Sequence, residues 1–375
     1  MKIGIDARLY RSSTAGIGRY SQNLIKNLLE NDPENEYVLL MTAQDEEEFQ
    51  SSNFQFPNAK VIITDIEHYS LAEQTKLPKI LKEQKCDLWH FLNFNVPVNF
   101  KENYVVTIHD LTLFFYDGRQ KKSLIHKLGY KYIFKKACQN SKKIIAVSQS
   151  TKNDIVTEFK TSEEKISVVY EAADDLEFAG VSKIFLEEMK LNYKIGDVPT
   201  ILYVGQWRPH KNLTGLIDAF NELRKSVPAK LVIVGKIDPA FPEVSEAIDI
   251  SPYKYDIIRT GFVSEEELAG FYKLANVFVF PSFYEGFGLP GLEAMAAGLP
   301  VAASDRTSLP EIYGAGAIYF NPSDPIDMME KIKQIICDLE VSSRLKIEGA
   351  KVFKKFSWVK TAQETLEVYK QINKN

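Results

Sequence analysis

Residues 277–304 read VFVFPSFYEGFGLPGLEAMAAGLPVAAS and contain a complete strand–loop–helix pattern. The first four residues are apolar and predict a buried strand that ends at the following proline. Glu285 then lies among glycines, which prevent a regular helix, whereas Glu293 falls in the first turn of a helix that Pro290 can open. The Gly-Phe-Gly segment lets backbone amides approach a ligand without a Cβ in the way. The layout therefore predicts a site for a polyhydroxylated, anionic ligand.

Short apolar runs alternate with amphipathic helical stretches along the rest of the chain. This alternation favours an α/β fold with parallel sheets that helices cover on both faces. The predicted strands of the first half are Lys2–Asp6, Tyr37–Met41, Lys60–Thr64, Leu88–Phe91, Tyr104–Ile108, Lys143–Val147 and Ile166–Val169. Those of the second half are Thr200–Val204, Lys230–Val234, Ile257–Thr260, Val277–Phe280, Pro300–Ala303 and Ala317–Tyr319.

Both halves of the chain begin with the same order of strand, glycine-containing loop and helix. We therefore expect two Rossmann-like domains that face each other across a cleft. The first comprises residues 1–178 and the second comprises residues 179–357. The polar segment 170–178 is the expected hinge, and a helix is expected near Ile184–Leu191.

The composition is that of an ordinary globular protein. With 375 residues and a net charge of −4, the chain can form two cores and has no general attraction for nucleic acid. Cys86, Cys138 and Cys337 are scattered, which indicates free thiols in a reducing cytosol. The N-terminus enters a strand directly, which predicts no signal peptide, and no apolar run reaches the roughly 18 residues of a membrane span. We expect a cytoplasmic protein that is either free or peripheral on the inner face of the cell membrane.

Two predicted strand-to-helix junctions carry groups that suit a phosphate. Arg208 and Lys211 follow strand Thr200–Val204 directly before a helix, so two cations lie beside a positive helix end. Gly16 and Gly18 lie between the first strand and the first helix, where exposed amides could hold a phosphate. The loop before Gly16 is too long for the tight turn of a dinucleotide site, so a nicotinamide cofactor is not predicted.

Histidines provide the other candidate groups. His109 and Asp110 end the apolar run YVVTI, at the carboxyl edge of a predicted strand. An imidazole that titrates near neutrality can bond a sugar hydroxyl or act as an acid or a base. His90 occupies a comparable place on its own strand. The five histidines show no ligand spacing and no Asp-x-Asp motif occurs, so no metal is expected.

One segment is strongly basic, since residues 119–143 hold nine Lys or Arg and no Asp or Glu. An apolar stripe with basic flanks is typical of helices that bind an anionic membrane surface or a polyanionic acceptor. The apolar residues at helical spacing are Leu124, Ile125, Leu128, Tyr132 and Ile133. The residues assigned to an acceptor or membrane side are His90, Lys121, Lys122, Lys127 and Lys131.

Each candidate also has a structural explanation, which the sequence leaves open. Gly16 can be a turn glycine, His109 can cap a strand end, and Lys211 can lie on a solvated basic turn. Glu293 can complement the helix dipole, and the basic segment can be the solvated face of a packed helix. Helix starts are predicted at Ser148, at Ser357 and at the capping box Ser264–Glu267.

Taken together, these segments resemble the retaining glycosyltransferases of family 4, also called glycosyl transferases group 1. The resemblance covers almost the whole chain. The matching segments are GIGRY at 16–20, HDL at 109–111, AVSQST at 146–151, YVGQWRPHKNL at 203–213, GFVSEEEL at 261–268, PSFYEGFGLPGLEAMAAGLPVAAS at 281–304 and SLPEIYGAGA at 308–317. The tail FSWVKTAQETLEVYK resembles the terminal helix of the family, which returns to the first domain at residues 358–375.

The resemblance implies a GT-B fold with a nucleotide-sugar donor. It implies that the diphosphate meets the Gly16 backbone, Arg208 and Lys211, and that the donor sugar meets Glu285 and His109. It implies that Glu293 holds the ribose, that main chain at Phe262 and Val263 meets the base, and that amides at Phe287, Gly288 and Leu289 meet sugar or phosphate. Such enzymes need no metal and no cofactor, because the basic pair neutralises the departing diphosphate.

The resemblance also orders the possible donors. Many members have a basic residue directly before the Lys-Asn pair, whereas this chain has His210 there and Arg208 two positions earlier. The HDL and SLPEIYGAGA segments are similar to those of bacterial mannosyltransferase-like members, which implies GDP-mannose and a glycan or lipid-linked acceptor. UDP-glucose and UDP-GlcNAc remain open as donors. A nucleotide-sugar epimerase and a non-catalytic sugar-nucleotide sensor remain open as functions.

Overall fold

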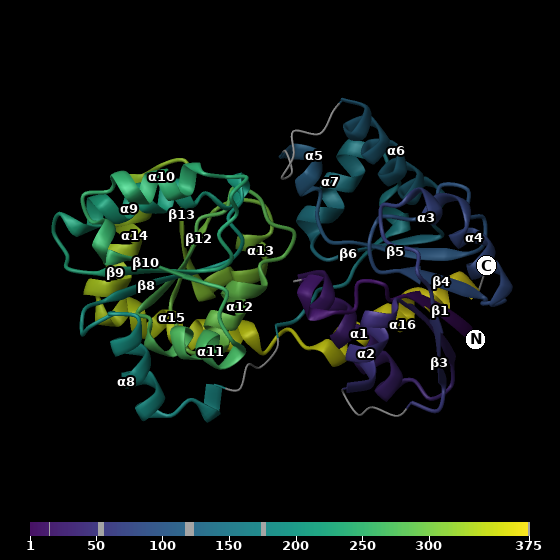
Figure 1. Ribbon diagram of the computed structural model, residues 1–375, viewed down its shortest axis with the longest axis horizontal. Helices are drawn as coiled ribbons and strands as arrows, with labels where there is room; N and C mark the ends of the chain where they lie inside the picture. The colour runs from purple at the N-terminus through teal and green to yellow at the C-terminus, as the bar shows by residue number, and fades with distance from the viewer. Residues whose placement is uncertain (15, 52–55, 117–123, 174–177, 374–375) are drawn as a thin grey trace. The chain divides into compact units, whose positions relative to one another are not determined.

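The computed structural model describes residues 1–14, 16–51, 56–116, 124–173 and 178–373 (Figure 1). The chain divides into two compact units. The first unit comprises Met1–Phe114, Lys121–Glu171 and Ser357–Asn375, and the second comprises Phe115–Gln120 and Ala172–Phe356. None of the helices in the described part is both long enough and apolar enough to span a membrane.

The first unit is built on a parallel sheet of seven described strands, in the order β3-β2-β1-β4-β5-β6-β7. The strands are β1 Lys2–Asp6, β2 Glu36–Met41, β3 Ala59–Ile63, β4 Leu88–Phe91, β5 Tyr104–Ile108, β6 Lys143–Ala146 and β7 Ile166–Val168. Every residue of β4 and β5 is buried, as expected for central strands with both faces covered.

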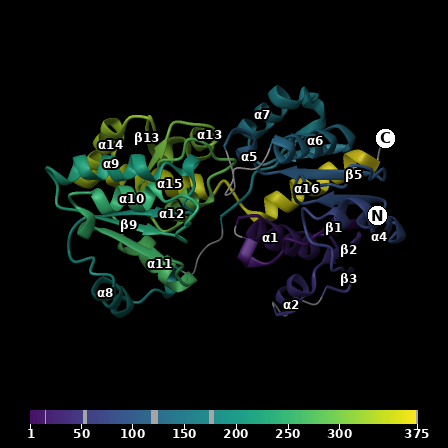
Figure 2. The same ribbon diagram turned by 45° about the horizontal axis from the view of Figure 1, so that its top comes forward.

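Two helices from opposite ends of the chain cover this sheet together. Helix α1 and helix α16 are in contact, and both views show them lying side by side (Figures 1 and 2). The helices of the unit are α1 Gly16–Asn31, α2 Ala43–Ser51, α3 Leu71–Thr75, α4 Leu77–Glu83, α5 Thr112–Phe115, α6 Leu124–Asn140, α7 Gln149–Phe159 and α16 Trp358–Asn373. The first unit is therefore completed by the last helix of the chain.

The second unit has a parallel sheet of six described strands, in the order β10-β9-β8-β11-β12-β13. The strands are β8 Thr200–Val204, β9 Lys230–Val234, β10 Ile257–Gly261, β11 Val277–Phe280, β12 Val301–Ser304 and β13 Ala317–Phe320. The helices are α8 Lys183–Asn192, α9 Leu213–Arg224, α10 Glu243–Ile250, α11 Glu265–Leu274, α12 Leu289–Ala296, α13 Leu309–Tyr313, α14 Pro325–Cys337 and α15 Leu339–Phe353. Figure 1 shows α9, α10 and α14 on one face and α11 and α12 on the other.

The predicted α/β fold of two Rossmann-like units is confirmed. Each predicted strand is present, and where an end differs it does so by a single residue, as is usual for the ends of elements. The predicted helix starts are confirmed too: Ser264 forms a capping box, Ser148 caps α7, and the Lys360 amide donates to Ser357 Oγ at 3.2 Å. The predicted hinge, residues 170–178, includes four residues outside the described part of the chain.

Candidate functional site

The strand order of the second sheet marks where a ligand is expected. From β8 the chain moves outward through β9 and β10, and then continues on the other side through β11, β12 and β13. Ligands of doubly wound sheets bind beyond the carboxyl ends of the two strands where the order reverses. The loops that follow β8 and β11 carry Arg208, Lys211 and Glu285. Candidates from two distant segments thus meet at one edge of the sheet.

Lys211 and Glu285 form the central contact of this edge. Lys211 Nζ donates to both carboxylate oxygens of Glu285, at 2.6 and 2.8 Å. Both side chains are largely buried, with 19% and 11% of their surface exposed. An ammonium group has a third N–H and a carboxylate has further lone pairs, so each partner retains capacity for a ligand. A cation that suits a phosphate and an acceptor that suits sugar hydroxyls lie side by side.

Asn212 fixes the loop that carries Lys211. It has a left-handed conformation, with φ of 55°, between the 3₁₀ turn Pro209–Lys211 and α9. Its buried carboxamide donates to the carbonyl oxygens of Pro281 and Pro322, at 3.2 and 2.7 Å. One side chain therefore joins the loops that follow β8, β11 and β13.

The Glu285 loop is held by the segment after β12. The Glu285 amide donates to Thr307 Oγ1 at 3.0 Å, and Ser308 Oγ donates to the Glu285 carbonyl at 3.0 Å. Gly288 ends the loop with φ of 111°, and an added Cβ would lie 2.5 Å from the Tyr313 hydroxyl. Glycine is thus required at this position, which is the N-cap of α12. Since glycine has no capping side chain, the first turn of α12 offers amides and a positive dipole end.

Arg208 lies on the same loop as Lys211 and has different partners. Its Nη1 lies 3.9 Å from the carboxylate of Asp238, a buried residue after β9. Its guanidinium carbon lies 5.3 Å from the centre of the Phe241 ring. At 3.9 Å the ion pair is loose, so a phosphate that binds Arg208 bidentately can compete with Asp238.

His210 adds no positive charge to this loop at neutral pH. Burial, together with the charges of Lys211 and Arg208, lowers the pKa of His210 to about 3. Its carbonyl accepts the Phe283 amide at 2.7 Å, which joins the loops after β8 and β11. The positive charge of the loop therefore comes from Arg208 and Lys211.

Glu293 lies on α12 and is buried, with 1% of the residue exposed. The Tyr272 hydroxyl of α11 donates to Glu293 Oε2 at 2.7 Å. Phe287 is buried against Phe356, and Leu289 is half-buried at the start of α12. If Glu293 binds the ribose, which is its predicted role, its carboxylate must share or exchange the hydrogen bond from Tyr272.

Phe262 and Val263, the residues predicted to meet the base, follow β10. The Phe262 side chain is 91% exposed, whereas Val263 is half-buried. No contact in the described part of the chain tests the base assignment.

In the first unit, the two glycines after β1 have different roles. Gly16 is exposed at the first residue of α1, with open space around it. An added Cβ at Gly18 would lie 2.2 Å from the Arg11 carbonyl oxygen. Loop packing therefore requires Gly18, while Gly16 leaves the start of α1 accessible to a ligand.

His109 lies at the carboxyl end of β5 with both ring nitrogens engaged. Nδ1 lies 2.7 Å from Glu171 Oε1, and Nε2 lies 2.9 Å from the Leu92 carbonyl oxygen. Because both partners are acceptors, the imidazolium form makes both bonds. Burial opposes this charge, but the hydrogen bond and the charge of Glu171 outweigh burial and raise the pKa of His109.

His90 lies within β4 and is fully buried. Its Nδ1 lies 2.6 Å from the Tyr369 hydroxyl of α16, and its Nε2 lies 2.8 Å from Thr107 Oγ1. Burial lowers the pKa of His90 to about 3, so the ring is neutral. The side chain joins the returning helix to the sheet, and its predicted place on the acceptor side gains no support from these contacts.

The lysines assigned to the same side belong to the basic segment, which forms α6. Lys121 and Lys122 lie outside the described residues, as does the side chain of Lys127. Lys131 is exposed, and its Nζ lies 4.2 Å from the centre of the Phe114 ring. Lys131 is thus the member of this group whose surroundings are known.

Comparison with known proteins identifies the family. Residues 186–352 match the family described as Glycosyl transferases group 1, and residues 14–175 match Glycosyltransferase Family 4. An uncharacterised glycosyltransferase of Methanocaldococcus jannaschii is 30% identical over 76% of this chain and 74% of its own length. The chain belongs to this glycosyltransferase family.

This glycosyltransferase is also similar to proteins over its whole length. O-antigen chain mannosyltransferase B of Escherichia coli is 27% identical over 99% of this chain and 100% of its own. The Anabaena protein HepE, solved with UDP and glucose, matches with a TM-score of 0.77 at 16% identity, over 99% of this chain and 100% of its own. The GT-B fold of the glycosyltransferase is therefore confirmed.

Several residues that support the candidate site of the glycosyltransferase, among them Asn212, Asp238 and Tyr272, were not predicted from the sequence. Asn212 had a usable signal, because an asparagine directly before a helix is a common N-cap. No sequence signal identified Asp238 or Tyr272. Asp238 meets Arg208 and Tyr272 meets Glu293 only because the order of the strands brings their segments together. The sequence identified the charged groups of this edge and missed the groups that position them.

Proposed function

We propose that this glycosyltransferase transfers a hexose from a nucleoside-diphosphate sugar to a glycan or a lipid-linked acceptor, with retention of configuration. The contact between Lys211 and Glu285 at the edge of the second sheet carries the proposal. GDP-mannose is the first donor candidate, because the Escherichia coli relative is named a mannosyltransferase. UDP-glucose and UDP-GlcNAc are the alternatives, since HepE was solved with UDP and glucose.

The groups of the second unit suit the charge that develops during transfer. Breaking the glycosidic bond produces an oxocarbenium-like sugar and a departing diphosphate. Lys211 and Arg208 supply cationic N–H groups, and the start of α12 supplies amides and a positive dipole end. Fixed groups of this kind lower the barrier electrostatically and can do so without a divalent metal.

The remaining predicted residues have narrower roles. Glu285 orients Lys211 and has lone pairs left for sugar hydroxyls. Gly16 leaves the amides of α1 open to a phosphate. A sugar hydroxyl would reach His109 Nε2 only by displacing the Leu92 carbonyl, so His109 suits a positioning role better than direct contact.

Release of nucleoside diphosphate from GDP-mannose, UDP-glucose and UDP-GlcNAc, with and without added acceptor glycans, tests the proposal. Lys211→Ala and Glu285→Ala should each slow turnover at least about tenfold, because one lost transition-state contact is worth about 3 kcal/mol. Lys225→Ala is the matched control, since it breaks an exposed Lys–Glu pair on the same unit. Near-normal turnover of Lys211→Ala would remove this pair from the reaction.

The same assay separates the other functions. An epimerase would interconvert donor sugars and release no nucleoside diphosphate. A sensor would bind a donor with neither transfer nor slow hydrolysis. Transfer that requires a UDP-sugar would keep the reaction class and replace GDP-mannose as the donor.

We also propose that the reaction proceeds without a divalent cation. The departing diphosphate would then be neutralised by Lys211, Arg208 and the amides of α12 alone. Activity should therefore persist after treatment with EDTA and extensive dialysis. Loss of activity that added Mg²⁺ restores would contradict this part of the proposal.

Finally, we propose that α6 lies against the anionic inner face of the cell membrane. Leu128 and Tyr132 are 65% and 54% exposed, and the neighbouring Lys131 and Lys135 are exposed as well. Exposed apolar side chains with adjacent cations suit the interface of an anionic bilayer. The face of α6 that packs on the unit consists of other residues, Phe134, Ala137 and Cys138.

A further inference from the structure

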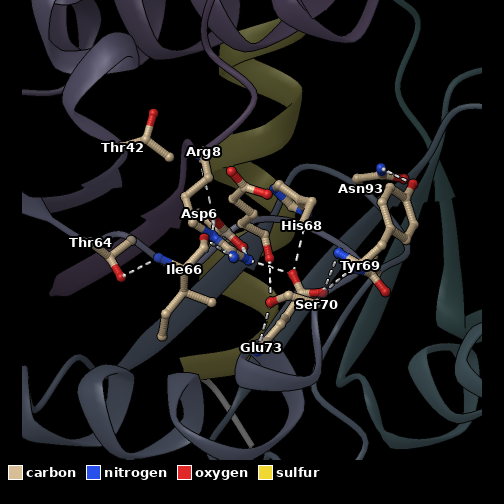
Figure 3. A network of polar contacts seen from close by, with 12 residues as sticks. Asp6, Arg8, Thr42, Thr64, Ile66, His68, Tyr69, Ser70, Glu73 and Asn93 are labelled. Atoms are coloured by element: carbon tan, nitrogen blue, oxygen red, sulfur yellow. Dashed lines mark hydrogen bonds and ion pairs between the residues drawn. The ribbon is translucent and has the colours of Figure 1, made fainter.

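The first sheet has its own reversal of strand order. The reversal lies between β1 and β4, the two central strands of the order β3-β2-β1-β4-β5-β6-β7. The same rule that places a ligand beyond β8 and β11 therefore applies to this edge of the first unit. Arg8 follows β1, Asn93 and Asn95 follow β4, and the loop between β3 and α3 lies beside them (Figure 3).

A buried ion cluster holds this loop in place. Arg8 donates to Asp6 Oδ2 at 2.6 Å and to Glu73 Oε1 at 2.8 Å, and all three side chains are at most 3% exposed. Arg8 Nη1 also donates to the Ile66 carbonyl at 3.0 Å. Glu73 Oε2 in turn accepts the Tyr69 amide at 2.9 Å (Figure 3). One guanidinium and two carboxylates thus fix the path of the chain from Ile66 to Glu73.

The cluster holds Tyr69 in an unusual and exposed position. Tyr69 has φ of 63°, a left-handed conformation that is strained for a bulky residue. The residue is nevertheless 63% exposed, with its ring 6.2 Å from that of Phe94. Asn93 Nδ2 donates to the Tyr69 hydroxyl at 3.4 Å. Backbone strain at an exposed aromatic residue is a reason to look for a function of its ring.

His68, the preceding residue, has unused hydrogen-bonding capacity. Its side chain is 10% exposed, and neither ring nitrogen has a hydrogen-bond partner among the described residues. Nδ1 lies 3.3 Å from Glu73 Oε1 without the geometry of a hydrogen bond. A buried polar group without a partner costs about 1–3 kcal/mol, which a ligand hydroxyl between His68 and Tyr69 would recover.

A carboxylate completes the group. Asp110 follows β5 and is half-buried, and its Oδ1 accepts the Thr112 amide at 2.7 Å. The carboxyl ends of parallel strands meet at one edge of the sheet, so Asp110, after β5, lies at the same edge as the residues that follow β1 and β4. An aromatic ring, an imidazole and a carboxylate at one edge are the groups that recognise a sugar: a stacking face and hydrogen-bond partners for hydroxyls.

We propose that the edge of the first sheet binds a hexose of the acceptor, which stacks on the Tyr69 ring and bonds His68 and Asp110 through its hydroxyls. This inference rests on the proposed function, because it assigns the acceptor to a site of the first unit. It makes Tyr69 a residue that determines acceptor specificity. The Arg8 cluster positions Tyr69 and does not touch the sugar.

Binding of simple methyl hexosides to the full chain tests the proposal directly. Saturation-transfer difference NMR is measured with methyl α-mannoside, methyl α-glucoside, methyl α-galactoside and methyl β-N-acetylglucosaminide. Tyr69→Gly removes the ring and relieves the left-handed strain, so the variant should fold, and its affinity should fall at least about tenfold. Tyr69→Phe should retain binding. Tyr255→Gly is the control, since Tyr255 is an 86% exposed tyrosine of the second unit.

His68 is tested in the same way. His68→Gln keeps a hydrogen-bonding group and should keep most of the binding, whereas His68→Phe should weaken it several-fold, on the order of one lost hydrogen bond. The proposal is overturned if no methyl hexoside binds the wild-type chain, or if binding is unchanged in Tyr69→Gly.

The outcome is independent of the proposed transfer reaction. Release of nucleoside diphosphate by the wild-type protein reports the transfer reaction, whereas binding of methyl hexosides reports the sugar site. If wild-type protein binds methyl hexosides through Tyr69 but releases no nucleoside diphosphate, the proposed function fails and the sugar site stands. If it releases nucleoside diphosphate but Tyr69→Gly responds to acceptor as wild type does, the sugar site fails alone.

Discussion

At the scale of single residues, His109 illustrates how partners decide a protonation state. The Glu171 carboxylate and the Leu92 carbonyl are both acceptors, so the ring must carry two protons to bond them. His90, only 2.8 Å from Thr107 Oγ1 and 2.6 Å from the Tyr369 hydroxyl, has partners that can both donate and accept. The partners of His109 thus favour its charged form, whereas burial leaves His90 neutral.

The raised pKa of His109 predicts a pH-dependent contribution to stability. Because the folded pKa exceeds the unfolded value near 6.5, the contribution is complete below about pH 6.5 and is lost as the pH rises through the folded pKa. Glu171→Gln removes the cause of the shift. The difference in unfolding free energy between wild type and Glu171→Gln, from urea unfolding, should therefore shrink as the pH rises above about 6.5.

Glu163→Gln, a change of an exposed glutamate in the same unit, serves as the control and should show no such trend. If the difference in unfolding free energy between wild type and Glu171→Gln stays constant or grows as the pH rises, Glu171 does not raise the pKa of His109. Titration of other groups affects wild type and variant equally and cancels in the difference.

The sequence predicted the charged residues of the candidate site more readily than the residues that hold them in position. Lys211 and Glu285 stand in segments whose glycines, prolines and apolar runs fix a loop at a strand end. Asn212, by contrast, acts through the carbonyls of Pro281 and Pro322, which are distant in sequence. Which carbonyls a carboxamide meets depends on the order of strands in the sheet, and local patterns do not encode that order.

At the scale of elements, α16 is joined to the first sheet by polar as well as apolar contacts. The Tyr369 hydroxyl meets His90, and Thr361 Oγ1 donates to the Tyr170 carbonyl at 2.8 Å. Trp358 lies against Tyr20 of α1, with ring centres 5.9 Å apart. These contacts fix the helix at both ends and explain why it belongs to the first unit.

Removing the hydroxyl of Tyr369 tests this attachment. Tyr369→Phe leaves Nδ1 of the buried His90 without its partner, so we expect a loss of about 1–3 kcal/mol in the free energy of unfolding. Urea unfolding measures the loss, with Tyr255→Phe on the exposed surface as the control. An unchanged midpoint would mean that the contact between α16 and β4 adds nothing to stability.

The elements themselves were predictable where the pattern is simple. Strands such as Tyr104–Ile108 are apolar throughout and bounded by polar residues, so their positions follow from the sequence alone. The buried face of α6 was harder, because its apolar residues cover more than one face. The stripe through Leu128 and Tyr132 is exposed, and the helix packs through Phe134. Composition alone does not say which of two apolar faces meets the sheet.

At the scale of the whole molecule, the proposed functions are divided between the two units. The second unit holds the cations and the helix start proposed for the donor. The first unit holds the exposed helix face proposed for the membrane and the edge proposed for the acceptor. The cations of the second unit and the acceptor edge of the first unit can therefore be probed by separate variants.

Flotation with liposomes tests the membrane surface of the first unit. Leu128→Ser combined with Tyr132→Ser removes exposed apolar side chains, and Lys131→Glu combined with Lys135→Glu reverses exposed charge. Both double variants should reduce binding to vesicles that contain anionic lipid, and salt should weaken binding of the wild type. Lys346→Glu with Lys354→Glu, on the second unit, is the control. Wild-type binding that ignores anionic lipid and salt would exclude an electrostatic role for α6.

The return of the last helix to the first unit has a consequence for synthesis on the ribosome. The second unit ends at Phe356, so every residue it needs has been translated before α16 is made. The first unit starts with β1 but lacks α16 until that helix is translated, and until then α1 lacks its contact with α16 and His90 lacks the Tyr369 hydroxyl. The usual order of co-translational folding, in which the N-terminal domain finishes first, is therefore reversed. Nascent chains should complete the second unit while the first still waits for its last helix.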